Sequence, residues 1–211
     1  MRKLDKLAKP AVLNSKAQEW TDEYVRLAAA GEKNLPSRWR HKQIKEGVAE
    51  ETTDRCAYCD SEMKAIHSGH VEHIDPRSIF PEKVVAWDNL TLACEQCNLS
   101  KKDYYSELVP LLNPFIDHPE DHLVFFGDLV MAKPGSDRGL ISVQKLKLYR
   151  NDLITQRRRR IETVMSYIER WTNAEGQDVK SVLLEIIHED FHSGPYKNSV
   201  KSLLVQLAVP I

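Results

Sequence analysis

Two CxxC pairs, Cys56/Cys59 and Cys94/Cys97, contain all four cysteines of this 211-residue chain. Four thiolates in two such knuckles suit one tetrahedral Zn²⁺ with no coordination position left for water, which makes a closed, structural site. The alternatives are four buried cysteines without a metal, or two disulfides, which a reducing compartment disfavours. Because four cysteines placed at random rarely form two CxxC pairs, the pattern predicts structural zinc.

The zinc would join two knuckles that are far apart in the sequence. Thirty-four residues, 60–93, separate them, which is more than a compact zinc ribbon requires. The helical rhythm of apolar residues is lost there, and GHVEHI (69–74) and NLTLAC (89–94) are typical of short strands. The segment from Glu95 to about Ser106 is typical of a helix. We therefore expect a strand, a loop, a strand and a helix, with zinc knuckles at both ends.

Helical periodicity marks the regions on both sides of this unit. Asn14 and Ser37 are placed to act as N-caps of the first two helices. The predicted flanking elements are an extended arm (1–13), helices over 14–30 and 37–50, a connector (107–140) with one strand (122–131), and helices over 151–171, 178–191 and 196–208.

The composition is that of a folded globular protein, with 42% hydrophobic and 29% charged residues. A net charge of −1 gives no global positive field, so any nucleic-acid surface must be a local patch. No apolar run approaches the roughly 20 residues that cross a bilayer. The start, MRKLDKLAKPAVL, lacks the apolar core of a signal peptide. We expect a cytoplasmic protein without a membrane segment.

Three motifs in the central unit carry a family resemblance. EH–DP (72–76), WDNL (87–90) and CEQCNLSKKD (94–103) together resemble the HNH endonucleases, over about residues 56–106. The resemblance implies a ββα-metal fold and hydrolysis of phosphodiester bonds in nucleic acid. The expected fold is therefore α+β but mostly α, with a small ββα-metal core and its four-cysteine zinc site wrapped by N- and C-terminal helices. The expected parts are an N-terminal arm with helices (1–50), the nuclease core (51–106), and a connector with C-terminal helices that packs on the core or a partner (107–211).

The resemblance also implies roles for the polar residues of these motifs. His73 would be the general base, and an unperturbed histidine pKa of about 6.5 suits that task near neutral pH. Glu72 and Asn98 would bind a catalytic Mg²⁺ or Mn²⁺, while Asn89 would hold the loop beside His73 through its amide. Lys101 and Lys102, further along the same helix, would contact flanking phosphates. Each also has a plain structural alternative: Glu72 as a solvated strand residue, Asn98 as a helix cap and Asn89 as a turn residue.

Outside this core, a weaker resemblance points to one branch of the family. The opening MRKL, the motif order and the NP–D–P–HL element (113–123) resemble the HNH subunit of Septu-type anti-phage defence systems. That resemblance implies a partner ATPase and a nucleic-acid substrate, for which we expect DNA rather than RNA. Two alternatives are a non-catalytic zinc module that binds nucleic acid or protein, and a stand-alone restriction or homing nuclease. No helix-turn-helix or other base-reading motif supports the stand-alone nuclease.

The sequence alone leaves the roles of several basic residues open. His67 and His70 lie in or beside the expected hairpin, where either could contact metal or substrate. The arginine run 157–160 covers most of a helix circumference, because successive helical residues turn by about 100°. Arg157 or Arg158 must therefore share the apolar face, and we expect it to pair with a carboxylate or a partner molecule. The other arginines would face solvent or nucleic acid.

Overall fold

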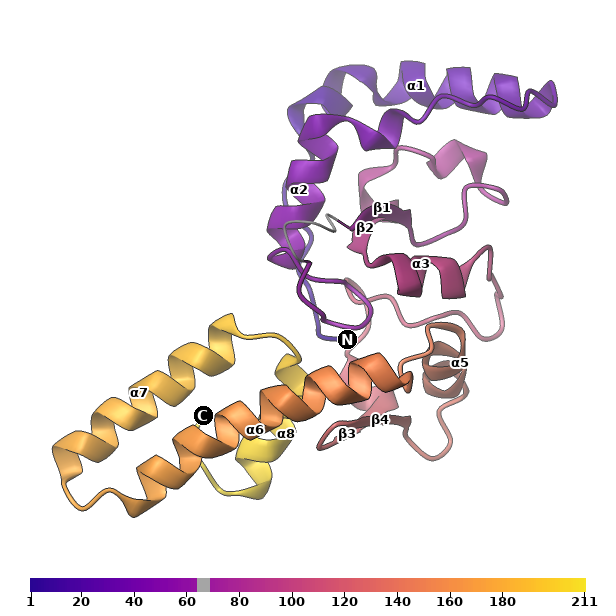
Figure 1. Ribbon diagram of the computed structural model, residues 1–211. Coiled ribbons are helices and arrows are strands. Elements are labelled where there is room, and N and C mark those ends of the chain that lie inside the picture. The colour runs from indigo at the N-terminus through magenta and orange to yellow at the C-terminus, as the bar shows by residue number, and fades with distance from the viewer. Residues whose placement is uncertain (64–68) are drawn as a thin grey trace.

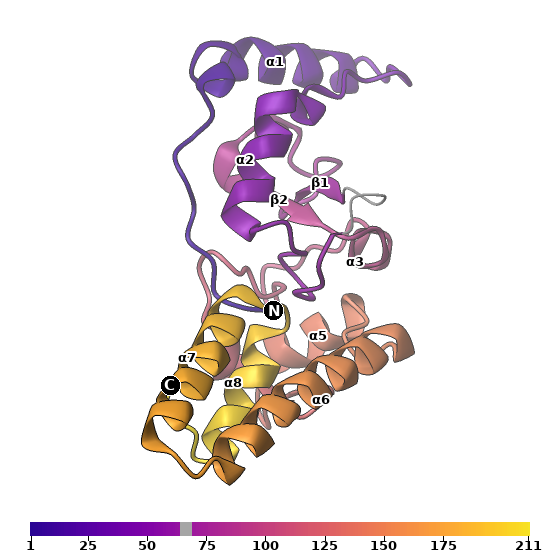
Figure 2. The same ribbon diagram turned by 60° about the vertical axis from the view of Figure 1, so that its left-hand side comes forward.

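The computed structural model describes residues 1–63 and 69–211, which form two lobes (Figure 1). The first lobe contains α1 (Ala11–Ala29), η1 (Arg38–Arg40), α2 (Lys42–Thr52), β1 (His70–His73), η2 (Pro81–Lys83), η3 (Trp87–Asn89), β2 (Leu90–Ala93) and α3 (Glu95–Lys101). The second contains α4 (Pro119–His122), β3 (Leu123–Phe126), β4 (Leu129–Ala132), α5 (Asp137–Lys145), α6 (Asn151–Asn173), α7 (Gln177–Ser193) and α8 (Lys197–Gln206). The N-terminus lies where the two lobes meet (Figures 1 and 2). The expected class, α+β with mostly helix, is confirmed.

The antiparallel hairpin of β1 and β2 forms the centre of the first lobe, and α3 follows β2 directly. The predicted strand–loop–strand–helix order is therefore present. The register sets Glu72 opposite Thr91 and His73 opposite Leu90. Because side chains alternate along a strand, Glu72 and His73 point to opposite faces of the hairpin. Helix α3 is shorter than expected, because Lys102 has a φ of +50° and breaks it.

The two N-terminal helices differ from the prediction at their starts. Helix α1 begins directly after Pro10, whose fixed φ and missing N–H suit the residue before a helix, so Asn14 lies inside the helix and is not its cap. The second expected helix is split into η1 and α2. His41 interrupts it and caps α2, with its Nδ1 accepting a hydrogen bond from the Gln43 N–H (3.2 Å). This break turns Trp39 toward the hairpin.

Buried apolar residues gather in three clusters. The first lobe is filled from α1, α2, η1 and the hairpin, by Leu13, Trp20, Tyr24, Trp39, Ile44, Val48, Leu90 and Leu92. A second cluster joins the cysteines to β3, β4 and α5, through Leu112, Leu123, Phe125, Val143, Leu146, Leu148 and Tyr196. The third packs α6, α7 and α8 together, through Val164, Ile168, Ile187, Phe191, Val200 and Leu204. Among the described residues, no helix is both long enough and apolar enough to cross a membrane.

The second lobe contains more regular structure than the sequence indicated. The single expected strand over 122–131 is a hairpin, in which β3 and β4 are joined at Gly127 with a φ of +58°. Helix α5 was not expected; Ser136 caps it by accepting a hydrogen bond from the Gly139 N–H (3.1 Å). The three C-terminal helices are present close to their predicted bounds.

Within the arginine run, Arg157 is the residue that faces the core, where it is 2% exposed. Of the two expected partners, a carboxylate or a partner molecule, no carboxylate among the described residues pairs with it: Nη1 donates to the carbonyl oxygen of Leu148 (2.8 Å), and the guanidinium lies 5.8 Å from the ring centroid of Tyr196. The remaining arginines lie outside the core: Arg158 pairs with Asp128, Arg160 pairs with Asp190, and Arg159 is exposed.

Candidate active site and zinc centre

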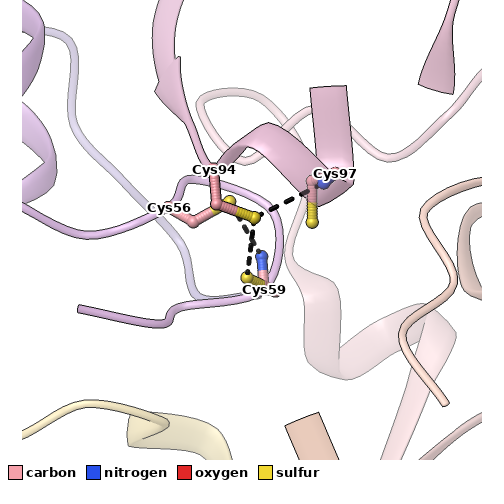
Figure 3. A group of neighbouring side chains, drawn as sticks. All are labelled: Cys56, Cys59, Cys94 and Cys97. Carbon is pink, nitrogen blue, oxygen red and sulfur yellow. Dashed lines mark hydrogen bonds between the residues drawn. The ribbon is translucent and has the colours of Figure 1, made fainter. Parts of the chain in front are cut away.

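The four cysteines come together at the start of α3, as predicted (Figure 3). All four sulfur atoms lie within 4.8 Å of one another. Tetrahedral sulfurs at the usual Zn–S distance of about 2.3 Å lie roughly 3.8 Å apart, and the sulfurs of Cys59 and Cys94 are 3.7 Å apart. Three of the cysteines are buried and Cys94 is partly exposed. The donor set and its spacing fit a structural zinc ion.

Arg150, the residue that precedes α6, reaches the same sulfur cluster from the second lobe. Its guanidinium donates to the sulfurs of Cys97 (3.6 Å), Cys59 (3.6 Å) and Cys94 (3.7 Å). Burial alone would lower the pKa of Arg150, but the neighbouring thiolates outweigh it and raise that pKa. Four thiolates around Zn²⁺ carry a net charge of −2, so Arg150 offsets half of it.

Glu72 lies on the face of the hairpin that is covered by α3. Its Oε1 is 2.9 Å from Nζ of Lys101, and the same ammonium donates to the carbonyl oxygen of His73 (2.8 Å). Burial raises the pKa of Glu72, and the charge of Lys101 opposes that rise. Lys101 is only 2% exposed, so the structure places it away from the surface where the sequence led us to expect a phosphate contact. Lys102, by contrast, is exposed.

His73 lies on the other face, where it is 6% exposed and packs edge-on against Trp39 with the ring centroids 5.1 Å apart. Its Nε2 is 2.8 Å from the carbonyl oxygen of Val84. Because a carbonyl can only accept a hydrogen bond, Nε2 carries the proton and Nδ1 holds the free lone pair. Burial lowers the pKa of His73 to about 4, which keeps the ring neutral at pH 7.

Asn89 ties together two points of the loop between the strands, Asp75 near its start and Lys83 in its middle. Its Oδ1 accepts from the Asp75 N–H (2.7 Å), and its Nδ2 donates to the carbonyl oxygens of Asp75 (3.1 Å) and Lys83 (3.2 Å). Lys83 directly precedes Val84, whose carbonyl fixes the His73 ring. The amide of Asn89 therefore supports the orientation of His73 through the backbone, and its role beside a catalytic base stays a prediction.

Asn98 lies in the first half of α3 and approaches β1 from the side. Its Nδ2 is 3.3 Å from Nδ1 of His70, which is exposed and lies two residues before Glu72. Residues two apart on a strand share a face, so His70, Glu72 and Asn98 surround one region between β1 and α3. His67 lies outside the described residues.

Arg77 is a neighbour of His73 that the sequence interpretation missed. It is exposed, its Nη1 donates to the Tyr24 hydroxyl (2.9 Å), and its guanidinium lies 4.8 Å from the ring centroid of Trp39. Trp39 thus contacts both the His73 ring and the Arg77 guanidinium. The available signal was an arginine four residues after His73, but its placement depends on the distant aromatic residues of α1 and η1.

Comparison with known proteins agrees with this geometry. Residues 56–104 match the family model described as HNH endonuclease. The chain is 30% identical over 169 residues to a "Septu protein PtuB" of Bacillus thuringiensis, covering 76% of this chain and 61% of that protein. It is 25% identical over 195 residues to a "Septu protein PtuB" of Bacillus mycoides (strain KBAB4), covering 74% of this chain and 66% of that protein. The chain thus spans just under two thirds of the length of these curated relatives, and its residues 56–104 match the HNH endonuclease domain model.

Proposed function

We propose that this protein is a metal-dependent endonuclease that hydrolyses phosphodiester bonds in nucleic acid, with His73 as its general base. The observation that carries the proposal is the environment of His73 inside the matched domain. The ring is neutral at pH 7, its Nε2 is bound by the Val84 carbonyl, and its Nδ1 has no hydrogen-bond partner among the described residues. A ring with one proton fixed and one lone pair free is suited to take a proton from attacking water.

The catalytic divalent ion would be held by Glu72 and Asn98, which lie on the β1–α3 side of the hairpin. Carboxylate and amide oxygens are the donors that Mg²⁺ and Mn²⁺ prefer, and the ion pair with Lys101 favours the ionised form of Glu72. Such an ion, when bound, stabilises negative charge on the phosphate and on the departing oxygen. In this proposal, the roles of the chain are to hold that ion, to position His73 through Val84 and Asn89, and to bind the backbone of the substrate.

Two exposed cations near the hairpin are proposed to contact phosphates of the substrate. Arg77 keeps further guanidinium N–H groups besides the one that binds Tyr24, and it is held in place by the Trp39 ring. Lys102 follows α3 and is exposed. Contacts of this kind position the substrate without reading its sequence. We therefore expect binding that depends on salt and has little sequence preference, with DNA as the substrate rather than RNA.

The similarity to two Septu PtuB proteins supports a nuclease role in anti-phage defence. We propose that the protein acts in the cytoplasm as the effector nuclease of such a system, together with an ATPase. The second lobe supplies surfaces that the nuclease chemistry does not use. One of these is the apolar stripe on α7 formed by Val179, Val182 and Ile186, which are 54%, 55% and 40% exposed.

A cleavage assay with matched variants tests the nuclease proposal. The zinc-loaded chain would be incubated with Mg²⁺ or Mn²⁺ and with plasmid, single-stranded DNA or RNA, in the presence and absence of a candidate ATPase partner. We expect His73→Ala to abolish cleavage while its zinc content is unchanged, and His188→Ala, at a histidine of α7 far from the hairpin, to cleave like the unmodified chain. Equal cleavage by His73→Ala would remove His73 from the mechanism. Absence of cleavage on every substrate, with zinc bound and the partner added, would favour a non-catalytic zinc module that binds nucleic acid or protein.

A further inference from the structure

We propose that His70 is a third protein ligand of the catalytic divalent ion and that it biases this site toward Mn²⁺ over Mg²⁺. The inference rests on the proposed function, since it concerns the ion that Glu72 and Asn98 would hold. It adds an imidazole nitrogen to the two oxygen donors of that proposal, and it assigns His70 to the ion rather than to the substrate.

The placement of His70 on β1 is the first argument. His70 and Glu72 share one face of the strand, and α3 covers that face through Asn98 and Lys101. The imidazole therefore lies beside the carboxylate and the amide that the nuclease proposal assigns to the ion.

The contact between His70 and Asn98 is the second argument. Nδ1 of His70 and the side-chain amide of Asn98 are 3.3 Å apart. Two ligand atoms in neighbouring positions of an octahedron lie about 3.0 Å apart when each bond is about 2.1 Å. A turn of the Asn98 amide by 180° exchanges Nδ2 for Oδ1 within the same volume. Both residues then offer a lone pair at the spacing that one ion requires.

The state of Glu72 is the third argument. Its Oε1 is already engaged by Lys101, which is buried and cannot turn away into solvent. Glu72 and Asn98 alone would therefore give an ion one partly neutralised carboxylate and one amide. His70 is exposed, has no carboxylate partner among the described residues, and can contribute a neutral donor without adding charge.

The chemistry of the donor set gives the expected metal preference. Carboxylate, carbonyl and water oxygens suit Mg²⁺, whereas imidazole nitrogen is a donor that transition metals accept more readily. A site with one imidazole, one carboxylate and one amide should therefore favour Mn²⁺. Replacing the imidazole by a carboxylate should move the preference toward Mg²⁺.

Binding of Mn²⁺ to the zinc-loaded chain, followed by electron paramagnetic resonance, tests the inference without relying on cleavage. Mn²⁺ is suitable because it competes poorly with zinc for thiolates. We expect His70→Ala to weaken Mn²⁺ binding by roughly ten- to a hundredfold, the range that even outer-shell partners of a metal can reach. Pulsed measurements should show coupling of Mn²⁺ to a ¹⁴N nucleus, and this coupling should vanish in His70→Ala but persist in His188→Ala. His70→Asp should bind Mg²⁺ more tightly relative to Mn²⁺ than the unmodified chain does.

The outcomes separate this inference from the nuclease proposal. If Glu72→Gln and Asn98→Ala weaken Mn²⁺ binding while His70→Ala binds Mn²⁺ normally, His70 is not a ligand and the nuclease proposal stands. If nitrogen coupling is unchanged in His70→Ala, another histidine supplies it and the inference fails. If Mn²⁺ binding is insensitive to Glu72→Gln, Asn98→Ala and His70→Ala together, the ion site itself is misplaced and both proposals fail.

Discussion

The carbonyl oxygen of Val84 lies 2.8 Å from Nε2 of His73 and fixes which ring nitrogen bears the proton. A backbone carbonyl can only accept a hydrogen bond, whereas a side-chain amide can turn and donate one. This tautomer therefore persists as long as the loop keeps its place. Asn89 keeps it there by bonding Asp75 and Lys83 of the loop. The orientation of the proposed base therefore depends on a residue that does not touch the ring.

The buried state of His73 predicts how stability depends on pH. Its pKa is lowered to about 4 in the folded chain, against about 6.5 when exposed, so the unfolded chain binds more protons between these values. Stability should therefore fall as the pH drops from about 6.5 to 4, by roughly 3 kcal/mol from this group, and should be unaffected by it above pH 7. Urea unfolding of the unmodified chain and of His73→Gln, without added divalent ion, checks this. A difference between the two chains that stays constant from pH 4 to pH 7 would contradict it.

Removal of the Asn89 amide should impair cleavage without impairing metal binding. Asn89→Ala leaves the N–H of Asp75 and the carbonyl of Lys83 without their partner, which should destabilise the fold by about 1–3 kcal/mol. The loop that orients His73 then loosens, and we expect the cleavage rate to fall by at least tenfold. Mn²⁺ affinity should remain within twofold, because Glu72 and Asn98 are untouched. Loss of Mn²⁺ binding in Asn89→Ala would show that the loop supports the ion site instead.

The buried pair of Glu72 and Lys101 predicts that the metal ion can replace Lys101 as the counter-charge of Glu72. Lys101→Met leaves the buried carboxylate without its cation, which should cost about 3–5 kcal/mol of stability. The bound ion would then become the main counter-charge of Glu72, so Mn²⁺ should stabilise Lys101→Met more than it stabilises the unmodified chain. Urea unfolding with and without saturating Mn²⁺ measures both effects. The double variant Glu72→Gln with Lys101→Met should lose this extra stabilisation, and an equal gain in all three chains would refute this replacement.

The contact of Arg150 with three sulfurs predicts that the unmodified chain releases zinc more slowly than a variant without this arginine. Arg150→Gln removes the cation that offsets the charge of the thiolate cage, so zinc release to a chromogenic chelator should accelerate by roughly ten- to a hundredfold. Arg159→Gln, an exposed arginine of the same helix, is the matched control and should release zinc at the original rate. Identical release rates in the two variants would mean that Arg150 contributes packing alone.

The sequence predicted the clustering of the four cysteines and the order of the hairpin and α3, whereas the catalytic roles of its polar residues stay predictions. The zinc cage depends on two CxxC spacings, and the EH pair and the asparagines are carried by a recognisable motif order. Arg77 and Arg150 were missed because their positions depend on aromatic residues of α1 and η1 and on the α5–α6 junction. The burial of Lys101 was not predicted, because it depends on how α3 is rotated against β1. The sequence shows only two adjacent lysines and does not indicate which of them faces the hairpin.

The start of the first helix and the strands of the second lobe also differ from the sequence prediction. Asn14 has the side chain of a cap, but Pro10 ends the extended arm sooner and the helix begins there. The segment 122–131 is apolar on both sides of Gly127 and Asp128, and these two residues form the tight turn that the prediction of a single strand overlooked. In both places, the backbone conformation of one residue, Pro10 or Gly127, decided where the helix begins or the chain turns.

The loop of the first knuckle is completed by the far end of the chain. Ser61 Oγ lies 3.0 Å from the Tyr196 hydroxyl, and Asp60 Oδ2 accepts from the Lys197 N–H (2.8 Å), across sequence separations of 135 and 137 residues. During synthesis, residues 56–104 therefore leave the ribosome well before the residues that complete their packing. A nascent chain stopped before Tyr196 would have every proposed catalytic residue and still lack the support of its zinc cage. The support of the zinc cage is therefore complete only after Lys197 has been synthesised.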